Sequence, residues 1–271
     1  MGPINGLFSL GGRTAVVTGA LGLLGREHCR CLAEAGANVV VADTDEAACV
    51  EFAAVLSSGS CGFALDVTSL LSVRTLNAEI LKRYGSVDIL VNNAAANDMF
   101  ENPSLASEQS MFENYPLEMW RKMMDVNVTG MFICSQIIGS AMAASGKGSI
   151  INIASTYGVV APDQSIYRRP DGGQQFFKSP AYPASKGAVI TFTKYLASYW
   201  GHKGVRVNAL SPGGVENGQE EFFRENYVRK TPLGRMAGRT DYRGAIIFLA
   251  SDASSYMTGA NLIIDGGWTS I

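Results

Sequence analysis

Short apolar runs alternate with longer amphipathic segments along most of the chain. The runs are rich in Val and Ile and almost continuously apolar, which predicts parallel strands that are buried on both faces. The segments between them have the length and apolar periodicity of helices. The runs are Thr14–Thr18, Asn38–Ala42, Gly62–Leu65, Val87–Val91, Ser149–Ala154, Val205–Leu210 and Asn261–Ile264. The segments are Leu23–Ala35, Asp45–Ser57, Leu70–Tyr84, Glu118–Ala144, Pro183–Trp200, Glu216–Arg229 and Asp241–Ala250.

Strands that alternate with helices predict an α/β fold built on a parallel sheet. Right-handed crossovers then place helices on both faces, which gives a doubly wound, Rossmann-type sheet with one strand for each of the seven runs. No linker or break in composition divides the chain, so we expect a single domain over residues 1–271.

Two long polar segments, 97–116 and 159–180, interrupt this alternation and contain Gly or Pro. Structureless segments of this length inside a compact domain usually serve function. Both follow predicted strands, so we expect both at the carboxyl edge of the sheet, where folds of this class bind ligands. They are expected to shape the substrate site.

Composition and charge narrow the choice of partners. The chain has 22 Lys and Arg against 24 Asp and Glu, and no basic block occurs, which argues against nucleic acid and anionic membranes. No apolar run reaches the roughly 18 residues that span a bilayer. The N-terminus lacks the charged start and apolar stretch of a signal peptide. We therefore expect a cytoplasmic protein that binds no membrane.

Side chains that commonly bind metal ions are few. The five cysteines fall within predicted helices and strands, at spacings that are poor for a zinc site. We therefore expect buried free thiols and no metal. The two histidines, His28 and His202, stand among polar residues of predicted helices, so we expect both on the surface.

A glycine-rich turn follows the first predicted strand and opens a helix, with Gly19, Gly22 and Gly25 at GxxGxxG spacing. Such glycines allow a tight turn and let the backbone approach a pyrophosphate, which the helix N-terminus then binds. The next strand ends in Asp43, 43 − 19 = 24 residues past the first glycine. A carboxylate there can accept hydrogen bonds from ribose hydroxyls. A turn without a ligand, and an ordinary helix start after Asp43, remain as alternatives.

Tyr182 and Lys186 stand four residues apart at the start of a predicted helix and therefore share one helix face. A phenol with its ordinary pKa near 10 exchanges protons poorly at neutral pH. A neighbouring ammonium stabilises the phenolate and lowers that pKa, so the pair can exchange a proton with a hydroxyl or carbonyl oxygen. The spacing also occurs by chance, but here it follows a long loop and a strand that leads into Ser155.

Further motifs occur in a fixed order along the chain. They are TGALGLLG at 18–25, Asp43, Asp66-Val67, Asn92-Asn93-Ala94-Ala95, Asn127, Ser155, Tyr182, Lys186, Asn208, Pro212-Gly213 and TGANLIIDGG at 258–267. With these matches the chain resembles the single-domain branch of the short-chain dehydrogenase/reductase family over essentially its whole length. Within that family it is loosely similar to gluconate dehydrogenases and to oxidoreductases of bacterial surface-sugar pathways.

The resemblance implies a role for each matched position. Tyr182 is implied as the general acid and base, Lys186 as the group that lowers its pKa and holds the nicotinamide ribose, and Ser155 as a partner of the reacting oxygen. Asn127 is implied to kink its helix and to hold a water in a proton relay through Lys186. The implied cofactor-binding set is Gly19, Gly22, Leu23, Leu24, Gly25, Asp43, Asp66, Val67, Asn92, Ala94, Tyr182, Lys186, Pro212, Gly213 and Val215.

The resemblance thus implies an oxidoreductase acting on a secondary alcohol or its ketone, and Asp43 favours NAD because a carboxylate repels a 2′-phosphate. The hydrophilic segment 159–180 favours a sugar, a sugar acid or a related polar substrate. We expect Arg168 or Arg169 to meet a carboxylate or phosphate on it. A 3-oxoacyl-carrier-protein reductase-like enzyme and a catalytically silent nucleotide-binding scaffold remain as alternatives. The resemblance also implies a homo-oligomer, either a dimer or a tetramer.

Overall fold

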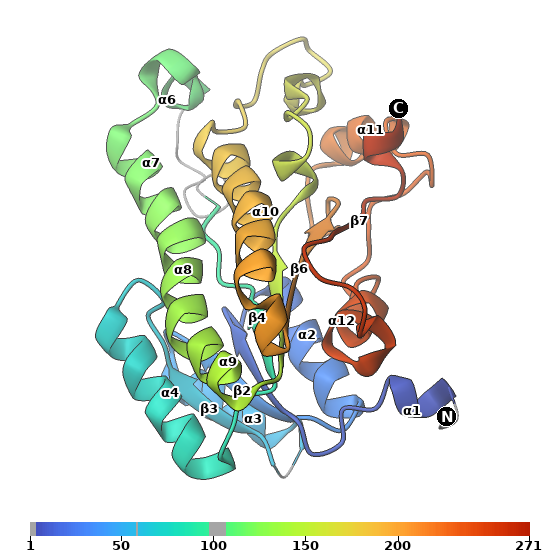
Figure 1. Cartoon of the computed structure of the whole chain (residues 1–271). Coiled ribbons are helices and arrows are strands. Elements are labelled where there is room, and N and C mark those ends of the chain that lie inside the picture. The colour runs from blue at the N-terminus through green and yellow to red at the C-terminus, as the bar shows by residue number, and fades with distance from the viewer. Residues whose placement is uncertain (1–3, 58, 98–106) are drawn as a thin grey trace.

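The computed structural model describes residues 4–57, 59–97 and 107–271. A seven-stranded parallel sheet lies at its centre, with the strand order β3-β2-β1-β4-β5-β6-β7 (Figure 1). The order reverses direction between β1 and β4, as the predicted doubly wound fold requires. The strands are β1 (Thr14–Thr18), β2 (Asn38–Asp43), β3 (Cys61–Ala64), β4 (Ile89–Asn92), β5 (Gly148–Ile153), β6 (Val205–Pro212) and β7 (Asn261–Ile264).

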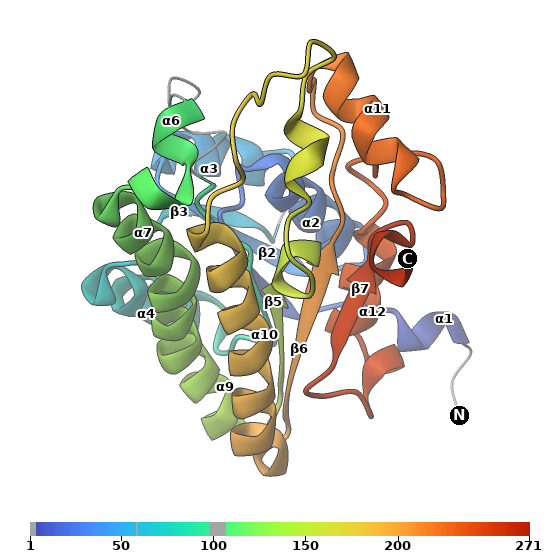
Figure 2. The same cartoon turned by 90° about the horizontal axis from the view of Figure 1, so that it is seen from above.

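Helices cover both faces of the sheet because successive strand residues point to opposite sides. Val17 and Val41 face a layer formed by α2, α3 and α12, whereas Val16 and Val40 face α4, α8, α9 and α10 (Figure 2). The predicted fold class is confirmed. The helices are α1 (Ile4–Leu7), α2 (Leu23–Glu34), α3 (Glu46–Ala54), α4 (Leu70–Tyr84), α6 (Ser107–Ser110), α7 (Leu117–Met124), α8 (Met131–Cys134), α9 (Ser140–Ser145), α10 (Ala181–Trp200), α11 (Glu221–Arg229) and α12 (Arg243–Ala250).

The predicted element bounds agree to within a few residues, with one larger difference at α11. The helix was expected from residue 216, but it begins at Glu221. The segment before it cannot be helical, because Gly218 has a φ of +73° and the amide of Glu216 donates to the carbonyl of Ala237. These residues instead form an irregular connection beside the end of β6.

The segments α7, α8 and α9 join into one long helix through two π-helical turns, Asp125–Gly130 and Ser135–Gly139. Among the described residues, this stretch is long and apolar enough to cross a membrane by length and composition, although no such run was expected. Its apolar side chains Ile133, Ile138 and Met142 are buried against the sheet. Its hydrophobicity therefore serves the core of the domain.

The environment of one histidine differs from the expectation. His202 is exposed, as expected, but His28 is only 1% exposed. Helical periodicity explains the error, because His28 shares a face with Cys31 and Leu32 and not with its charged sequence neighbours. The five cysteines are free and buried, which confirms that expectation.

Candidate active site

The glycine turn between β1 and α2 has a backbone that only glycine allows at two of its positions. Gly19 has a φ of +61°, and a Cβ there would lie 2.6 Å from the Cα of Ala94. A Cβ on Gly25 would lie 2.2 Å from the carbonyl oxygen of Gly19. Gly22 is the N-cap of α2 and has no side chain to cap it. The first N–H groups of α2, at Leu23 and Leu24, are therefore suited to bind a pyrophosphate.

Two side chains that belong to the sequence motifs, but for which the sequence predicts no role, hold this turn in place. The Asn93 amide donates to the carbonyl oxygens of Thr18 and Gly19 at 3.0 and 2.8 Å. The Thr18 hydroxyl accepts from the backbone N–H groups of Asn93 and Ala94 at 3.1 and 3.0 Å. The end of β4 is thereby fixed against the end of β1, which places Ala94 beside the glycine turn.

Asn92 does not face this turn, although it was expected to line the cofactor cleft. It is buried, and its amide donates to Ser135 at 3.1 Å and to Asn152 at 2.8 Å. Because neighbouring residues at a strand end point to opposite faces, Asn93 lies toward the turn and Asn92 lies toward the helix layer. Asn92 thus connects β4, β5 and the long helix.

The Asp43 carboxylate lies at the end of β2 and contacts the glycine turn. One of its oxygens accepts from the N–H of Leu21 at 2.9 Å, and the other accepts from the N–H of Thr44 at 2.8 Å. The side chain is half-buried. This arrangement puts a fixed negative charge next to the expected pyrophosphate site, where the adenosine ribose of a dinucleotide would lie.

The remaining predicted cofactor positions lie at the carboxyl ends of β3 and β6. The Asp66 carboxylate accepts from the N–H and hydroxyl of Thr68, while Val67 is buried beside Gly130. After β6, a Cβ on Gly213 would lie 2.8 Å from the Cα of Asp265. Further contacts fix this segment through Pro212, whose carbonyl accepts from Thr156, and Val215, which pairs with Ala237.

Ser155, Tyr182 and Lys186 come together at the carboxyl end of β5. Ser155 lies close enough to Tyr182 to affect the pKa of its phenol as a hydrogen-bond partner. The Lys186 ammonium donates to the carbonyl of Ile153 at 2.8 Å and lies 5.7 Å from the centre of the Tyr182 ring. A hydroxyl, a phenol and an ammonium therefore converge on one place, which suits proton transfer to or from a bound oxygen.

The pKa values of this group follow from its burial. Burial raises the pKa of the Tyr182 phenol, and the hydrogen bond with Ser155 acts in the opposite direction. The expected depression by Lys186 is thus not seen, because loss of solvation of the phenolate dominates. Burial also lowers the pKa of the Lys186 ammonium to about 8.

Asn127 lies in the first π-helical turn, which agrees with the irregular helix that was expected there. Its side chain accepts from the N–H of Ala96 at 2.7 Å and donates to the carbonyl of the same residue at 3.2 Å. It also donates to the Ser185 hydroxyl at 3.0 Å, which in turn donates to the Tyr182 carbonyl at 2.8 Å. Asn127 thus connects the end of β4 to the turn of α10 that carries Tyr182; its role in a water relay stays a prediction.

The segment 159–180, hereafter the lid, is attached to α11 and to the C-terminal residues. The ring of Tyr167 packs on Phe176 and on Phe223 of α11. Tyr167 also belongs to one buried apolar cluster with Tyr227 of α11 and Trp268 near the C-terminus, whose rings stack on each other. Asn226 donates to two lid carbonyls, those of residues 166 and 168. The lid therefore has a defined conformation over the carboxyl edge.

The lid arginines and the other long loop are placed only in part. Arg168 and Arg169 are both exposed, so their expected contact with an anion stays a prediction. A buried cation of the lid is instead Lys178, which sequence reasoning passed over. Residues 98–106 of the loop 97–116 lie outside the described residues, while Ser107 and Ser110 bond to lid backbone atoms of Gln174 and Phe177.

Comparisons with known proteins agree with this geometry. Residues 13–168 match the family model described as short chain dehydrogenase, and residues 171–269 match one described as Enoyl-(Acyl carrier protein) reductase. The chain is 37% identical over 270 residues to galactitol 2-dehydrogenase (L-tagatose-forming) of Cereibacter sphaeroides, with 97% of each chain covered. It is 33% identical over 278 residues to 2-dehydro-3-deoxy-D-gluconate 5-dehydrogenase of Bacillus subtilis, with both chains fully covered.

A solved structure extends the comparison to three dimensions. The gluconate 5-dehydrogenase from Burkholderia cenocepacia, in complex with NADP and tartrate, matches with a TM-score of 0.86 at 31% identity. The match covers 99% of this chain and 100% of that one. The chain therefore belongs to the short-chain dehydrogenase/reductase family of oxidoreductases.

Proposed function

We propose that this protein oxidises a secondary alcohol of a polyhydroxylated compound, a sugar alcohol or a sugar acid, with NAD, or reduces the corresponding ketone. The observation that carries the proposal is the convergence of Ser155, Tyr182 and Lys186 at the same carboxyl edge of the sheet as the glycine turn. Intact acid–base chemistry argues against a silent nucleotide-binding scaffold. The relatives named for galactitol and for a deoxygluconate, together with the polar lid, support the substrate class.

The residues divide the work of the proposed reaction. Bound nicotinamide supplies the hydride acceptor or donor. The Tyr182 oxygen takes the proton of the substrate hydroxyl during oxidation and returns it during reduction. Ser155 holds the substrate oxygen in place by a hydrogen bond. Lys186 stabilises the phenolate while Tyr182 is deprotonated.

An acyl-carrier-protein reductase is the second candidate, and the description of the family model over residues 171–269 favours it. Such an enzyme needs a basic surface for an acidic carrier, and the chain has no basic block. Turnover should therefore be assayed with galactitol, D-gluconate and an acetoacetyl thioester, each with NAD and NADP. We expect oxidation of a polyol or an aldonate; turnover of the thioester alone would favour the second candidate.

Preference for NAD over NADP is expected to be about 100-fold in affinity, because a phosphate beside the Asp43 carboxylate costs a few kcal/mol. A relative with NADP bound shows that family membership does not decide the cofactor. Asp43→Asn keeps an oxygen for the N–H of Leu21 but removes the charge, so it should tighten NADP binding and leave the turn intact. Fluorescence titration with both dinucleotides measures this; equal affinities for the parent protein would contradict it.

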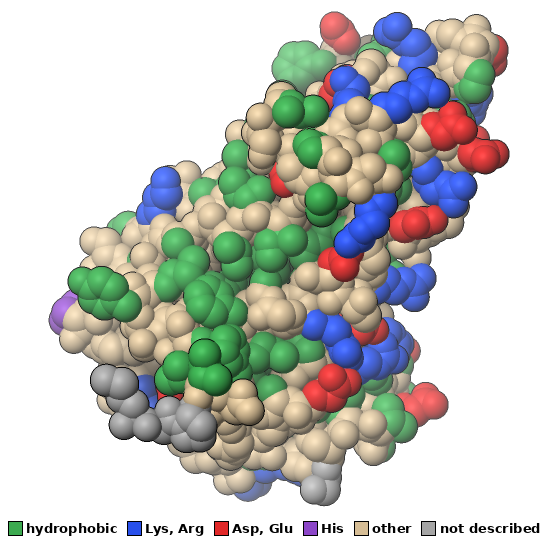
Figure 3. All heavy atoms as spheres, turned by 90° about the vertical axis from the view of Figure 1, so that its right-hand side faces the viewer, with side chains coloured by type: hydrophobic (Ala, Val, Ile, Leu, Met, Phe, Trp, Pro, Cys, Tyr) green, Lys and Arg blue, Asp and Glu red, His purple; other side chains and the backbone are tan. Residues whose placement is uncertain are grey.

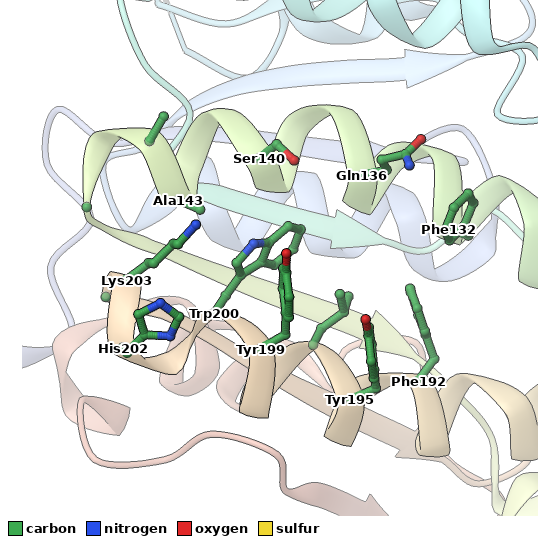
Figure 4. Close-up of a pocket in the computed structure, with 14 residues that line it drawn as sticks. Phe132, Gln136, Ser140, Ala143, Phe192, Tyr195, Tyr199, Trp200, His202 and Lys203 are labelled. Atoms are coloured by element: carbon green, nitrogen blue, oxygen red, sulfur yellow. The ribbon is translucent and has the colours of Figure 1, made fainter.

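We also propose a homo-oligomer that buries exposed apolar surface. On α10, Phe192, Tyr195 and Tyr199 stack in a row beside the helix that carries Phe132 (Figure 4). Tyr195 and Tyr199 are 60% and 55% exposed. Hydrophobic side chains also gather on the side of the molecule formed by α1, α12 and the edge strand β7 (Figure 3). Exposed aromatic surfaces of this kind are typical of subunit interfaces.

Light scattering tests the assembly. We expect a mass of two or four times the 28.8 kDa of one chain; a monomer at micromolar concentration would contradict the proposal. We further propose a cytoplasmic location, which the five free thiols support because reducing compartments keep thiols unpaired.

A further inference from the structure

Lys178 is a buried cation that lies next to Tyr182. It is 6% exposed, and its ammonium lies over the Tyr182 ring at 4.4 Å from the ring centre. The Lys186 ammonium is 5.7 Å from the same centre. The phenol oxygen is attached to that ring. The distance between the Lys178 ammonium and this oxygen is therefore no longer than a small substrate.

The lid holds the backbone of Lys178 in a fixed position. The Gln164 side chain accepts from the N–H of Lys178 at 2.8 Å and donates to its carbonyl at 3.1 Å. Gln174 in turn donates to the carbonyls of Gln164 and Phe176, each at 2.9 Å. Two side-chain amides thus fix the backbone of this part of the lid by internal hydrogen bonds. These bonds distinguish Lys178 from a lysine on a solvated loop.

The ammonium also contacts the loop 97–116, which was predicted to shape the substrate site. It donates to the Asn97 side chain at 2.5 Å, and Asn97 follows Ala96, whose backbone is bonded to Asn127. Lys178 therefore lies where the lid, the segment after β4 and the start of α10 meet. We expect a substrate whose reacting oxygen contacts Ser155 and Tyr182 to extend between these elements.

The charge of Lys178 discriminates between the two substrate classes of the proposed function. Neutral hydroxyls gain little from a cation compared with water, whereas a carboxylate in a place largely closed to water forms a strong charge-assisted hydrogen bond. The lid arginines are exposed, so Lys178 is better placed than either of them for a group attached near the reacting carbon.

We propose that Lys178 binds a carboxylate of the substrate, so that the enzyme acts on a polyhydroxylated acid in preference to a neutral polyol. This inference rests on the proposed function and names one of its two substrate classes. The Tyr182 ring and Asn97 are among the groups that contact the ammonium in this structure.

Matched pairs of substrates, in which the charged carboxylate is replaced by a neutral amide of nearly the same shape, test the proposal. D-Gluconate is compared with D-gluconamide, and D-galactonate with D-galactonamide, and galactitol and glycerol are included as neutral polyols. We expect the parent enzyme to prefer an acid over its amide. In Lys178→Met, kcat/KM for the acid should fall roughly 10- to 100-fold, mainly through KM, while kcat/KM for the amide stays within a few-fold.

Two further variants separate recognition from support of the lid. Lys178→Arg keeps the positive charge and should retain the preference for the acid. Lys147→Met removes a lysine whose side chain is 65% exposed and lies beside the opposite end of β5. This variant should leave kcat/KM unchanged for both the acid and the amide. Thermal unfolding of each variant shows whether Lys178→Met is folded.

Each other outcome has a defined meaning. Equal losses on acid and amide would show that Lys178 only supports the lid, and a loss of acid preference in Arg169→Ala but not in Lys178→Met would assign the anion to the arginine. Turnover of the polyols without the acids would also overturn the inference, while the proposed function would stand. No turnover of any of these compounds with either dinucleotide would overturn the proposed function and the inference with it.

Discussion

Replacing Tyr182 by Phe is expected to lower kcat by roughly 10²- to 10⁴-fold, which is the usual contribution of general acid–base catalysis. The substitution removes the phenol oxygen, which lies near Ser155, but keeps the ring against which the Lys178 ammonium packs. NAD affinity should therefore change little. Steady-state rates and dinucleotide titration on the same preparation measure both effects.

Tyr157→Phe provides a matched control. Tyr157 is another half-buried phenol, two residues from Ser155, and its hydroxyl pairs with that of Tyr167 at 3.4 Å. We expect this variant to keep its rate within a few-fold. A nearly normal rate in Tyr182→Phe would mean that the proton passes through another group.

Acidification is expected to destabilise the fold through His28. Neither ring nitrogen of His28 has a hydrogen-bond partner among the described residues, and burial lowers its pKa from 6.5 to about 4. Between these values the unfolded chain binds a proton that the native state does not. The free energy of unfolding is thus not reduced by His28 above pH 6.5, and it decreases progressively as the pH falls from 6.5 toward 4.

The expected loss is about 2 kcal/mol between pH 8 and pH 5, and about 3 kcal/mol in total below pH 4, at 1.36 kcal/mol for each pKa unit. Urea unfolding at the two pH values measures it. His28→Phe removes the titrating group and should flatten this part of the pH dependence, whereas His202→Phe, at an exposed position, should not. Parallel slopes for the parent and His28→Phe would assign the acid sensitivity to other groups.

The sequence predicted the sheet well because a strand buried on both faces leaves a continuous apolar run, as Val39–Ala42 does in β2. Spacing on a single helix was equally informative, since Tyr182 and Lys186 must share a face. Polar residues at strand ends were harder to interpret. Strand register decides which of Asn92 and Asn93 reaches the glycine turn, and the amino-acid sequence alone does not specify the register to one residue.

The errors have a common physical origin in contacts that are distant along the chain. The charged sequence neighbours of His28 predict a surface position, but its burial depends on which side of α2 packs against α12 and the sheet. Lys178 is followed by Ser179 and Pro180 in a polar loop, and its burial depends on Gln164 and Asn97. A more careful reading of helical periodicity would have found His28, but no local pattern marks Lys178.

Because every thiol is buried, we expect the native protein to react very slowly with cysteine reagents. Cys29 and Cys134 lie in opposite helix layers, and each is fully buried. Burial also raises the pKa of the Cys134 thiol to about 12, which suppresses the reactive thiolate. Alkylation followed by mass spectrometry would therefore record the opening of the two layers separately. The chain thus carries intrinsic probes for whether its two layers unfold together or in sequence.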